Sequence, residues 1–314
     1  MSNTVVTNTP KHSLILNTED WLNLKLSSEE SEPIIGTAEN PIIRPLTKNL
    51  IQAPEKAFKT TFLMRLCLGI SSGETIYPAF PVVRPRPVLY LHGELAAAEL
   101  KERLQSAATG LKSSLDGFFQ GRSLRANLVT SDGQKAIEEL VEQYKPEVLV
   151  FDAWQSFIAG SDENSFKDVS VAATFMDRLI AEYGLTIFLV IHLGKNPQRG
   201  ARGHSLLSGW RDTKIDLKRD GNKVTVKVEP RWAKPPEQLT LMFSGGTLLE
   251  LGPAVWTDQA KDIRNCVRCK GGKISRQELG EMMFLRDSTL RMALKRAQDC
   301  GAIVIGEDET ITLP

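Results

Sequence analysis

The sequence predicts an α/β fold with a largely parallel sheet that is covered by helices on both faces. From about residue 42, short apolar segments alternate with longer segments of helical periodicity. This alternation is typical of parallel strands joined by crossover helices. Three of the apolar segments lead into Glu94, Asp152 and His192. Because open α/β sheets bind ligands at the carboxyl ends of their strands, we expect a ligand site there.

The elements of this core follow one another in a regular order. We expect strands at 49–53, 88–92, 127–130, 148–152 and 186–192, since each is a short apolar run. We expect helices at 59–72, 96–108, 133–144 and 168–183. In the first helix, apolar residues recur at helical spacing from Phe62 to Ile70, and Gly73 suits its C-cap.

The pattern changes beyond this alternating region. Residues 214–218, 223–229 and 239–243 alternate as antiparallel strands do, and Asp220-Gly221 is a hairpin turn signal. We therefore expect a three-stranded antiparallel extension of the sheet, which completes a core domain over residues 42–252. Residues 1–41 are predicted to be an N-terminal tail and linker, because they are polar at first and then acidic with Ser and Pro.

Length and composition limit the class of protein. A chain of 314 residues suggests about two domains, and 41% hydrophobic with 25% charged residues is ordinary for a globular protein. No apolar run reaches the roughly 18–20 residues of a membrane span, and the N-terminus lacks the layout of a signal peptide. We expect a cytoplasmic protein without a membrane partner. The net charge of +1 indicates no global field for nucleic acid.

The four cysteines are too few and too unevenly spaced for a disulfide scaffold. They are Cys67, Cys266, Cys269 and Cys300. The pair Cys266 and Cys269 has the spacing of half a zinc site, but no second pair follows at a usable spacing. We favour the other interpretation, reduced thiols on a helix.

Residues 261–314 are predicted to form a separate winged-helix domain. Ser275 and Glu278 form a capping box before a short helix, a second helix covers 288–299, and strands follow at 302–305 and 310–313. Ten basic residues stand against four acidic ones between 261 and 296. We expect DNA contact through Arg291, Lys295 and Arg296 of the second helix. The alternatives are a face that is only solvated and a face that docks a protein.

A phosphate-binding pattern lacking its glycines lies between the first strand and the first helix. The pattern G-x-x-x-x-G-K-[ST] uses glycines so that backbone N–H groups can surround phosphates. Ala53 and Phe58 occupy the glycine positions here, and we expect the turn to stay at negative φ. The candidate loop residues are Pro54, Glu55, Lys56, Ala57, Phe58, Lys59, Thr60 and Thr61. The alternative is that Lys59 and Thr60 only begin an amphipathic helix.

The three residues at the strand ends have roles that suit such a loop. Asp152 ends an apolar strand, where a carboxylate can hold Mg²⁺. Glu94 could orient or deprotonate an attacking water, or else cap the next helix. His192 could contact a γ-phosphate, or else be structural.

A loop rich in Gly, Arg and Lys follows His192. Lys195, Arg199 and Arg202 would give it sequence-independent contacts with nucleic-acid phosphates. The alternative is an exposed connection with no partner.

Taken together, these motifs resemble the RecA-like ATPases related to the hexameric plasmid replication helicase RepA and, more distantly, DnaB. The resemblance covers about residues 17–250. It rests on Pro54-Glu-Lys-Ala-Phe-Lys-Thr60, Pro85-Arg-Pro-Val-Leu-Tyr-Leu-His-Gly-Glu94, Val148-Leu-Val-Phe-Asp152, Leu189-Val-Ile-His192 and Arg202-Gly-His-Ser-Leu-Leu-Ser-Gly-Trp-Arg211, in that order.

The resemblance implies a RecA-like P-loop core that binds ATP and Mg²⁺. Lys59 and Thr60 would hold the phosphates and the metal, with Asp152 supporting the metal. Glu94 would activate water and His192 would contact the γ-phosphate. A neighbouring subunit would contribute an arginine, for which Arg211 is favoured over Arg231.

The resemblance also implies a homo-oligomer, with a hexameric ring as one form, that acts on DNA, single-stranded above all. The leading hypothesis is a replicative helicase or helicase-related motor of a mobile element, with replication or mobile-element proteins as partners. The alternative is a DNA-binding regulator or adaptor that binds nucleotide and hardly hydrolyses it.

Overall fold

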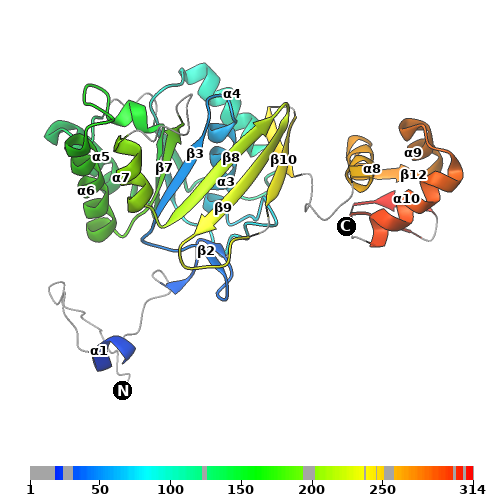
Figure 1. The fold of residues 1–314 in the computed structure, drawn as a ribbon, viewed down its shortest axis with the longest axis horizontal. Helices are drawn as coiled ribbons and strands as arrows, with labels where there is room; N and C mark the ends of the chain where they lie inside the picture. The colour runs from blue at the N-terminus through cyan, green and yellow to red at the C-terminus, as the bar shows by residue number, and fades with distance from the viewer. Residues whose placement is uncertain are drawn as a thin grey trace.

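The computed structural model describes residues 18–23, 31–121, 126–193, 202–236, 238–244, 246–250, 258–299, 302–306 and 309–313. Its main feature is a nine-stranded sheet with helices on both faces (Figure 1). The strand order is β11-β10-β9-β8-β3-β7-β6-β4-β5. The parallel part contains β3 (Lys48–Ala53), β4 (Val88–His92), β5 (Phe118–Gly121), β6 (Val148–Asp152), β7 (Thr186–His192) and β8 (Thr213–Asp220). The predicted α/β class is confirmed.

The sheet separates two apolar layers because alternate strand residues point to opposite faces. On β4, Val88 and Tyr90 belong to the layer that includes α3, whereas Leu89 and Leu91 belong to the other. The first layer holds α3 (Lys59–Ser72) and α4 (Ala97–Ala108). The second holds α5 (Ser131–Tyr144), α6 (Phe166–Tyr183) and α7 (Arg202–Trp210). The helices predicted between residues 59 and 183 are all present, with ends shifted by at most two residues.

One predicted strand is wrong. Residues 127–130 form the turn before α5, and the edge strand beside β4 is β5 instead. Local hydrogen bonds explain the turn, since Asn127 Oδ1 accepts from the backbone N–H of Val129 and Thr130 Oγ1 accepts from that of Gly133. An apolar run with such capping residues begins a helix rather than a strand.

The assignment of residues 1–41 to a tail and linker is wrong at its end. β1 (Ile35–Gly36) and β2 (Pro41–Ile43) pair antiparallel, and Ile34 and Ile35 are each only 1% exposed. Gly36 has φ +111°, and a Cβ there would lie 2.5 Å from the carbonyl oxygen of Asn40. This glycine allows the tight hairpin that folds the segment onto the core.

The extension of the sheet has more strands than predicted. β8 runs parallel to β3 and antiparallel to β9 (Lys223–Pro230), so it joins the two parts of the sheet. β10 (Leu239–Ser244) and β11 (Thr247–Glu250) complete it, and β11 was not predicted. The hairpin turn at Asp220-Gly221 is confirmed, with Gly221 at φ +58°.

The C-terminal unit has its own apolar cluster. It contains α8 (Asp258–Cys269), β12 (Lys273–Ser275), α9 (Arg276–Met283), α10 (Asp287–Asp299), β13 (Val304–Ile305) and β14 (Thr310–Thr312), with sheet order β12-β14-β13. The capping box of Ser275 and Glu278 is confirmed. β12 was not predicted, the only expectation for α8 was that Cys266 and Cys269 lie on a helix, and the winged-helix assignment stays a prediction.

Two further observations concern the described residues only. None of their helices is both long and apolar enough to cross a bilayer. Cys266 and Cys269 are free thiols on α8, in agreement with the favoured interpretation that they lie on a helix.

Candidate functional site

The parallel register brings the predicted strand-end residues to one edge of the sheet. Ala53 pairs with His192 on β3 and β7, and His92 pairs with Asp152 on β4 and β6. A cleft of about 520 Å³ opens at this edge, and Lys59, Thr60, Glu94 and His192 line it. The candidate loop, the Glu94 carboxylate and His192 thus lie in one cleft, although about 130 residues separate the loop from His192 in the sequence.

Lys59 is the first residue of α3 and is only 4% exposed. Its Nζ donates to the carbonyl oxygens of Ala53 and Pro54 at 3.1 and 2.8 Å, so the side chain folds back over its own loop. Burial lowers the pKa of this ammonium group, and the nearby carboxylates of Asp152 and Glu94 oppose that shift. A buried cation at a helix N-terminus is suited to an anion.

The loop before Lys59 departs from the expected conformation. Phe58 has φ +59° and ψ +27°, and Lys56 also has φ +59°. The expectation of negative φ at the glycine positions is therefore wrong for Phe58. This residue gives α3 no side-chain cap, so the N–H groups of the first helical turn remain available as donors. These donors, together with Lys59, fit a bound phosphate chain.

Asp152 lies at the end of β6 and is 2% exposed. The Tyr90 hydroxyl donates to its Oδ2 at 2.6 Å, and His92 Nε2 lies 3.8 Å from the same oxygen. Asp152 does not line the cleft itself, but lies beside His92, which does. A hydroxyl at Thr60 with one carboxylate fits Mg²⁺, which needs few protein ligands when a substrate supplies phosphates.

Tyr90 and His92 are site residues that sequence reasoning missed. Their period of two on β4 was the available signal, since it places both on the face that carries Asp152. His92 Nδ1 accepts from the backbone N–H groups of Glu94 and Leu95, which leaves the proton of the neutral ring on Nε2, toward Asp152. Burial lowers the pKa of His92, and burial beside Asp152 raises the pKa of Tyr90 well above its ordinary value.

Glu94 and His192 form a pair across the cleft. His192 Nε2 lies 3.7 Å from Glu94 Oε1. The contact with His192 lowers the pKa of Glu94, and partial burial opposes it. His192 Nδ1 is buried and has no hydrogen-bond partner among the described residues. The pair therefore offers a carboxylate that is ionised at neutral pH and an unsatisfied imidazole nitrogen.

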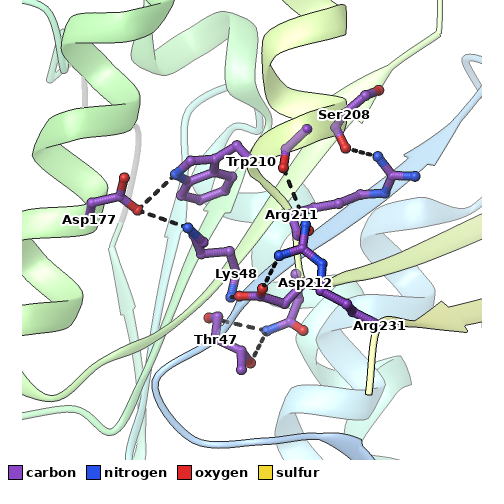
Figure 2. Close-up of polar contacts among 10 residues, drawn as sticks. Thr47, Lys48, Asp177, Ser208, Trp210, Arg211, Asp212 and Arg231 are labelled. Atoms are coloured by element: carbon purple, nitrogen blue, oxygen red, sulfur yellow. Dashed lines mark hydrogen bonds and ion pairs between the residues drawn. The ribbon is translucent and has the colours of Figure 1, made fainter. Parts of the chain in front are cut away.

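The two candidate finger arginines lie away from this cleft. Arg211 precedes β8 and Arg231 follows β9. Both arginines therefore lie near Lys48, at the start of β3 and at the opposite edge of the sheet (Figure 2). Arg231 pairs with Asp212 at 3.2 Å, and Arg211 donates to the carbonyl oxygen of Ser208. Neither side chain can reach the cleft of its own chain, because the length of β3 separates them from it.

The residues predicted to contact DNA are only partly described. Lys195 and Arg199 lie outside the described residues, and for Arg202 only its place as the first residue of α7 is known. Arg291, Lys295 and Arg296 are exposed on α10. Arg291 Nε lies 3.1 Å from Asp287 Oδ2, so part of its charge is neutralised within the helix.

Comparisons with known proteins place the chain in a family. The model of the family described as "AAA domain" matches residues 40–198, just over half of the chain. No curated protein matches this chain. Among solved structures, the KaiC-like protein of the archaeon Pyrococcus horikoshii is 13% identical, with 70% of this chain and 96% of that one covered and a TM-score of 0.46. The flagellar accessory protein FlaH of Methanocaldococcus jannaschii is 14% identical, with 66% and 89% covered and the same TM-score.

Proposed function

We propose that this chain, which belongs to the AAA domain family, is an oligomeric, Mg²⁺-dependent ATPase with a RecA-like P-loop core that acts on DNA. The more specific form of the proposal is a replicative helicase, or a helicase-related motor of a mobile element. The observation that carries the ATPase part is the meeting of Lys59, Glu94 and His192 in one cleft at the carboxyl edge of the sheet.

The residues of the cleft divide the work of phosphoryl transfer. Lys59 and the N-terminal N–H groups of α3 bind the phosphates. To do so, Lys59 Nζ gives up its hydrogen bonds to the carbonyl oxygens of Ala53 and Pro54 and donates to phosphate oxygens instead. Thr60 and Asp152 would hold Mg²⁺, which when bound would supply positive charge to the phosphates. Tyr90 and His92 fix the Asp152 carboxylate in place.

Glu94 is the group that orients and deprotonates the attacking water. Its lowered pKa keeps it ionised at neutral pH, as a base must be. His192 holds Glu94 from one side through Nε2 and, as a residue that lines the cleft, contacts the γ-phosphate region. A neighbouring subunit supplies Arg211 to complete the site, because the arginine of the same chain lies at the opposite edge of the sheet. A head-to-tail assembly follows from this sharing, and the form that we propose for it is a closed ring.

The DNA part of the proposal is supported by the C-terminal unit. Lys295 and Arg296 present exposed positive charge on α10, and no partner among the described contacts neutralises them. Lys195, Arg199 and Arg202 would add phosphate contacts from the loop after β7. Particle imaging with an ATP analogue and single-stranded DNA tests the ring.

The ATPase itself is tested by turnover of the wild type and of Lys59→Ala, each with and without single-stranded DNA. We expect hydrolysis that depends on Lys59 and rises with DNA. The matched control is Lys218→Ala, which removes an exposed lysine of β8 outside the cleft and should leave turnover unchanged. Hydrolysis that persists in Lys59→Ala, or is absent throughout, would contradict the proposal.

A second candidate is a nucleotide-binding, DNA-binding regulator with little hydrolysis. The observation that favours it is the bonding of Lys59 to its own loop carbonyls beneath a loop without glycines. Tight ATP binding by the wild type with negligible turnover, with or without DNA, would favour this candidate over the motor.

A further inference from the structure

A stacked cluster of side chains flanks the phosphate-binding loop. We propose that Phe243 and Arg219 hold this glycine-free loop in its phosphate-binding conformation, as positioning residues that replace the missing glycines. The inference rests on the proposed function, since it concerns how the same loop binds ATP. Neither residue belongs to the sequence motifs of the site, and both come from the antiparallel extension of the sheet.

The loop has a conformation that its residues disfavour. Phe58 and Lys56 both have φ +59°, in the left-handed region where a Cβ approaches the following carbonyl group. Glycine adopts this region freely, whereas other residues remain there only when the surrounding structure holds them. The sequence supplies no glycine between Ala53 and Lys59. The stabilisation must come from contacts outside the loop.

Arg219 contacts both left-handed residues at once. Its Cζ lies 4.3 Å from the centroid of the Phe58 ring, and its Nη1 donates to the carbonyl oxygen of Lys56 at 2.8 Å. Its Nε donates to the carbonyl oxygen of Gly221 at 2.7 Å, which orients the guanidinium plane. Arg219 therefore fixes the side chain of one strained residue and the backbone of the other.

Phe243 supports the same ring from β10. The rings of Phe58 and Phe243 stack with centroids 4.1 Å apart and planes 16° apart. The backbone N–H of Phe243 donates to the carbonyl oxygen of Asn222 at 2.8 Å, so β10 is tied to the turn that also anchors Arg219. Phe58, Arg219 and Phe243 all line the cleft. The turn between β8 and β9 and the strand β10 thus form one connected support for the loop.

The test measures the dissociation constant of a fluorescent, non-hydrolysable ATP analogue. We expect Phe243→Leu and Arg219→Ala each to weaken binding about tenfold, which corresponds to about 1.4 kcal/mol. In the Phe58→Gly background, Phe243→Leu should weaken binding less than about twofold, because glycine adopts φ +59° without support. Lys218→Ala, at the neighbouring position of β8, is the control and should bind as the wild type does.

Two results would overturn the inference: an equal loss of affinity from Phe243→Leu in both backgrounds, or no loss in either. If the wild type itself fails to bind the analogue, the proposed function fails. Urea unfolding without nucleotide then tests separately whether Phe243 supports the loop conformation. Phe243→Leu should then lower the unfolding midpoint in the wild type and lower it less in Phe58→Gly. Equal shifts in the two backgrounds would overturn the inference by this independent measure.

Discussion

Arg231 Nη2 donates a hydrogen bond to the backbone carbonyl oxygen of Arg211 at 2.9 Å (Figure 2). The same guanidinium group pairs with Asp212 Oδ1 at 3.2 Å and reaches the carbonyl oxygen of Gly209 at 3.4 Å. Arg231 is thus held by its own chain and fixes the backbone from which Arg211 projects. This arrangement favours Arg211 as the arginine offered to a neighbour and gives Arg231 a positioning role.

We predict that Arg211→Ala lowers turnover by about 10³-fold or more while ATP affinity changes little, since an arginine finger acts on the transition state. Steady-state turnover and analogue binding measure the two effects. Arg44→Ala, which removes an exposed arginine that follows β2, is the control. A loss of affinity equal to the loss of turnover would contradict the finger role.

Arg231→Ala should act differently, through stability. The Asp212 carboxylate, whose side chain is 11% exposed, would lose its guanidinium partner and keep only the Lys48 N–H as a described donor. We expect a loss of about 1–3 kcal/mol in the free energy of unfolding, measured by urea titration. If stability is unchanged and turnover falls as far as in Arg211→Ala, the two arginines have exchanged roles.

Glu94→Gln should reduce ATP turnover about 10²–10⁴-fold and leave binding intact, because the amide accepts no proton from water. The variant keeps the size of the side chain, so the cleft is preserved. Single-turnover hydrolysis separates chemistry from binding. Glu182→Gln, on an exposed glutamate of α6 outside the cleft, is the matched control. Wild-type rates in Glu94→Gln would exclude this base.

The pair of Glu94 and His192 predicts a pH-dependent contribution to stability. The folded pKa of Glu94 lies below its ordinary value of 4.5, with His192 as the main cause. The stabilisation is therefore present above pH 4.5 and is lost as pH falls through the lowered pKa. We expect wild type and His192→Gln to differ in unfolding free energy at about pH 6 and to converge in acid. A difference that grows in acid would have the wrong sign.

Tyr90→Phe tests whether Tyr90 supports Asp152, the carboxylate proposed to hold Mg²⁺. Removal of the 2.6 Å bond to Asp152 leaves a buried carboxylate short of a donor, so we expect a loss of about 2 kcal/mol in unfolding free energy. The Mg²⁺ concentration for half-maximal turnover should rise on the order of tenfold, as for other residues that orient a ligand. Tyr77→Phe, on a buried tyrosine of the same layer, is a comparison for removal of a hydroxyl. An unchanged Mg²⁺ requirement would remove Tyr90 from the site.

Charge reversal on α10 tests the DNA interaction. Lys295→Glu and Arg296→Glu should weaken DNA binding, and each should reduce the slope of log affinity against log salt concentration by about one. Arg291→Ala should have a smaller effect, since this arginine already pairs with Asp287. Binding measured at several salt concentrations distinguishes these effects. Unchanged affinity in both reversals would favour a protein-docking role for the unit.

The site was predictable where function requires a particular residue type at a strand end. Glu94, Asp152 and His192 could be placed from short apolar runs, because parallel strands bring their carboxyl ends to one edge. Tyr90 and His92 carried a weaker signal, since a polar residue within a buried strand has many possible partners. The false strand at 127–130 arose because side-chain capping outweighed an apolar run.

The sequence by itself determined the α/β class, the order of most elements and the edge at which the site lies, because these depend on periodicity and on local capping. Only the tertiary structure decided the conformation of the loop. Phe58 has a left-handed backbone because Phe243 and Arg219, more than 150 positions away, lie against its ring. Contacts between such distant residues depend on how the strands pair, and no local pattern encodes that pairing.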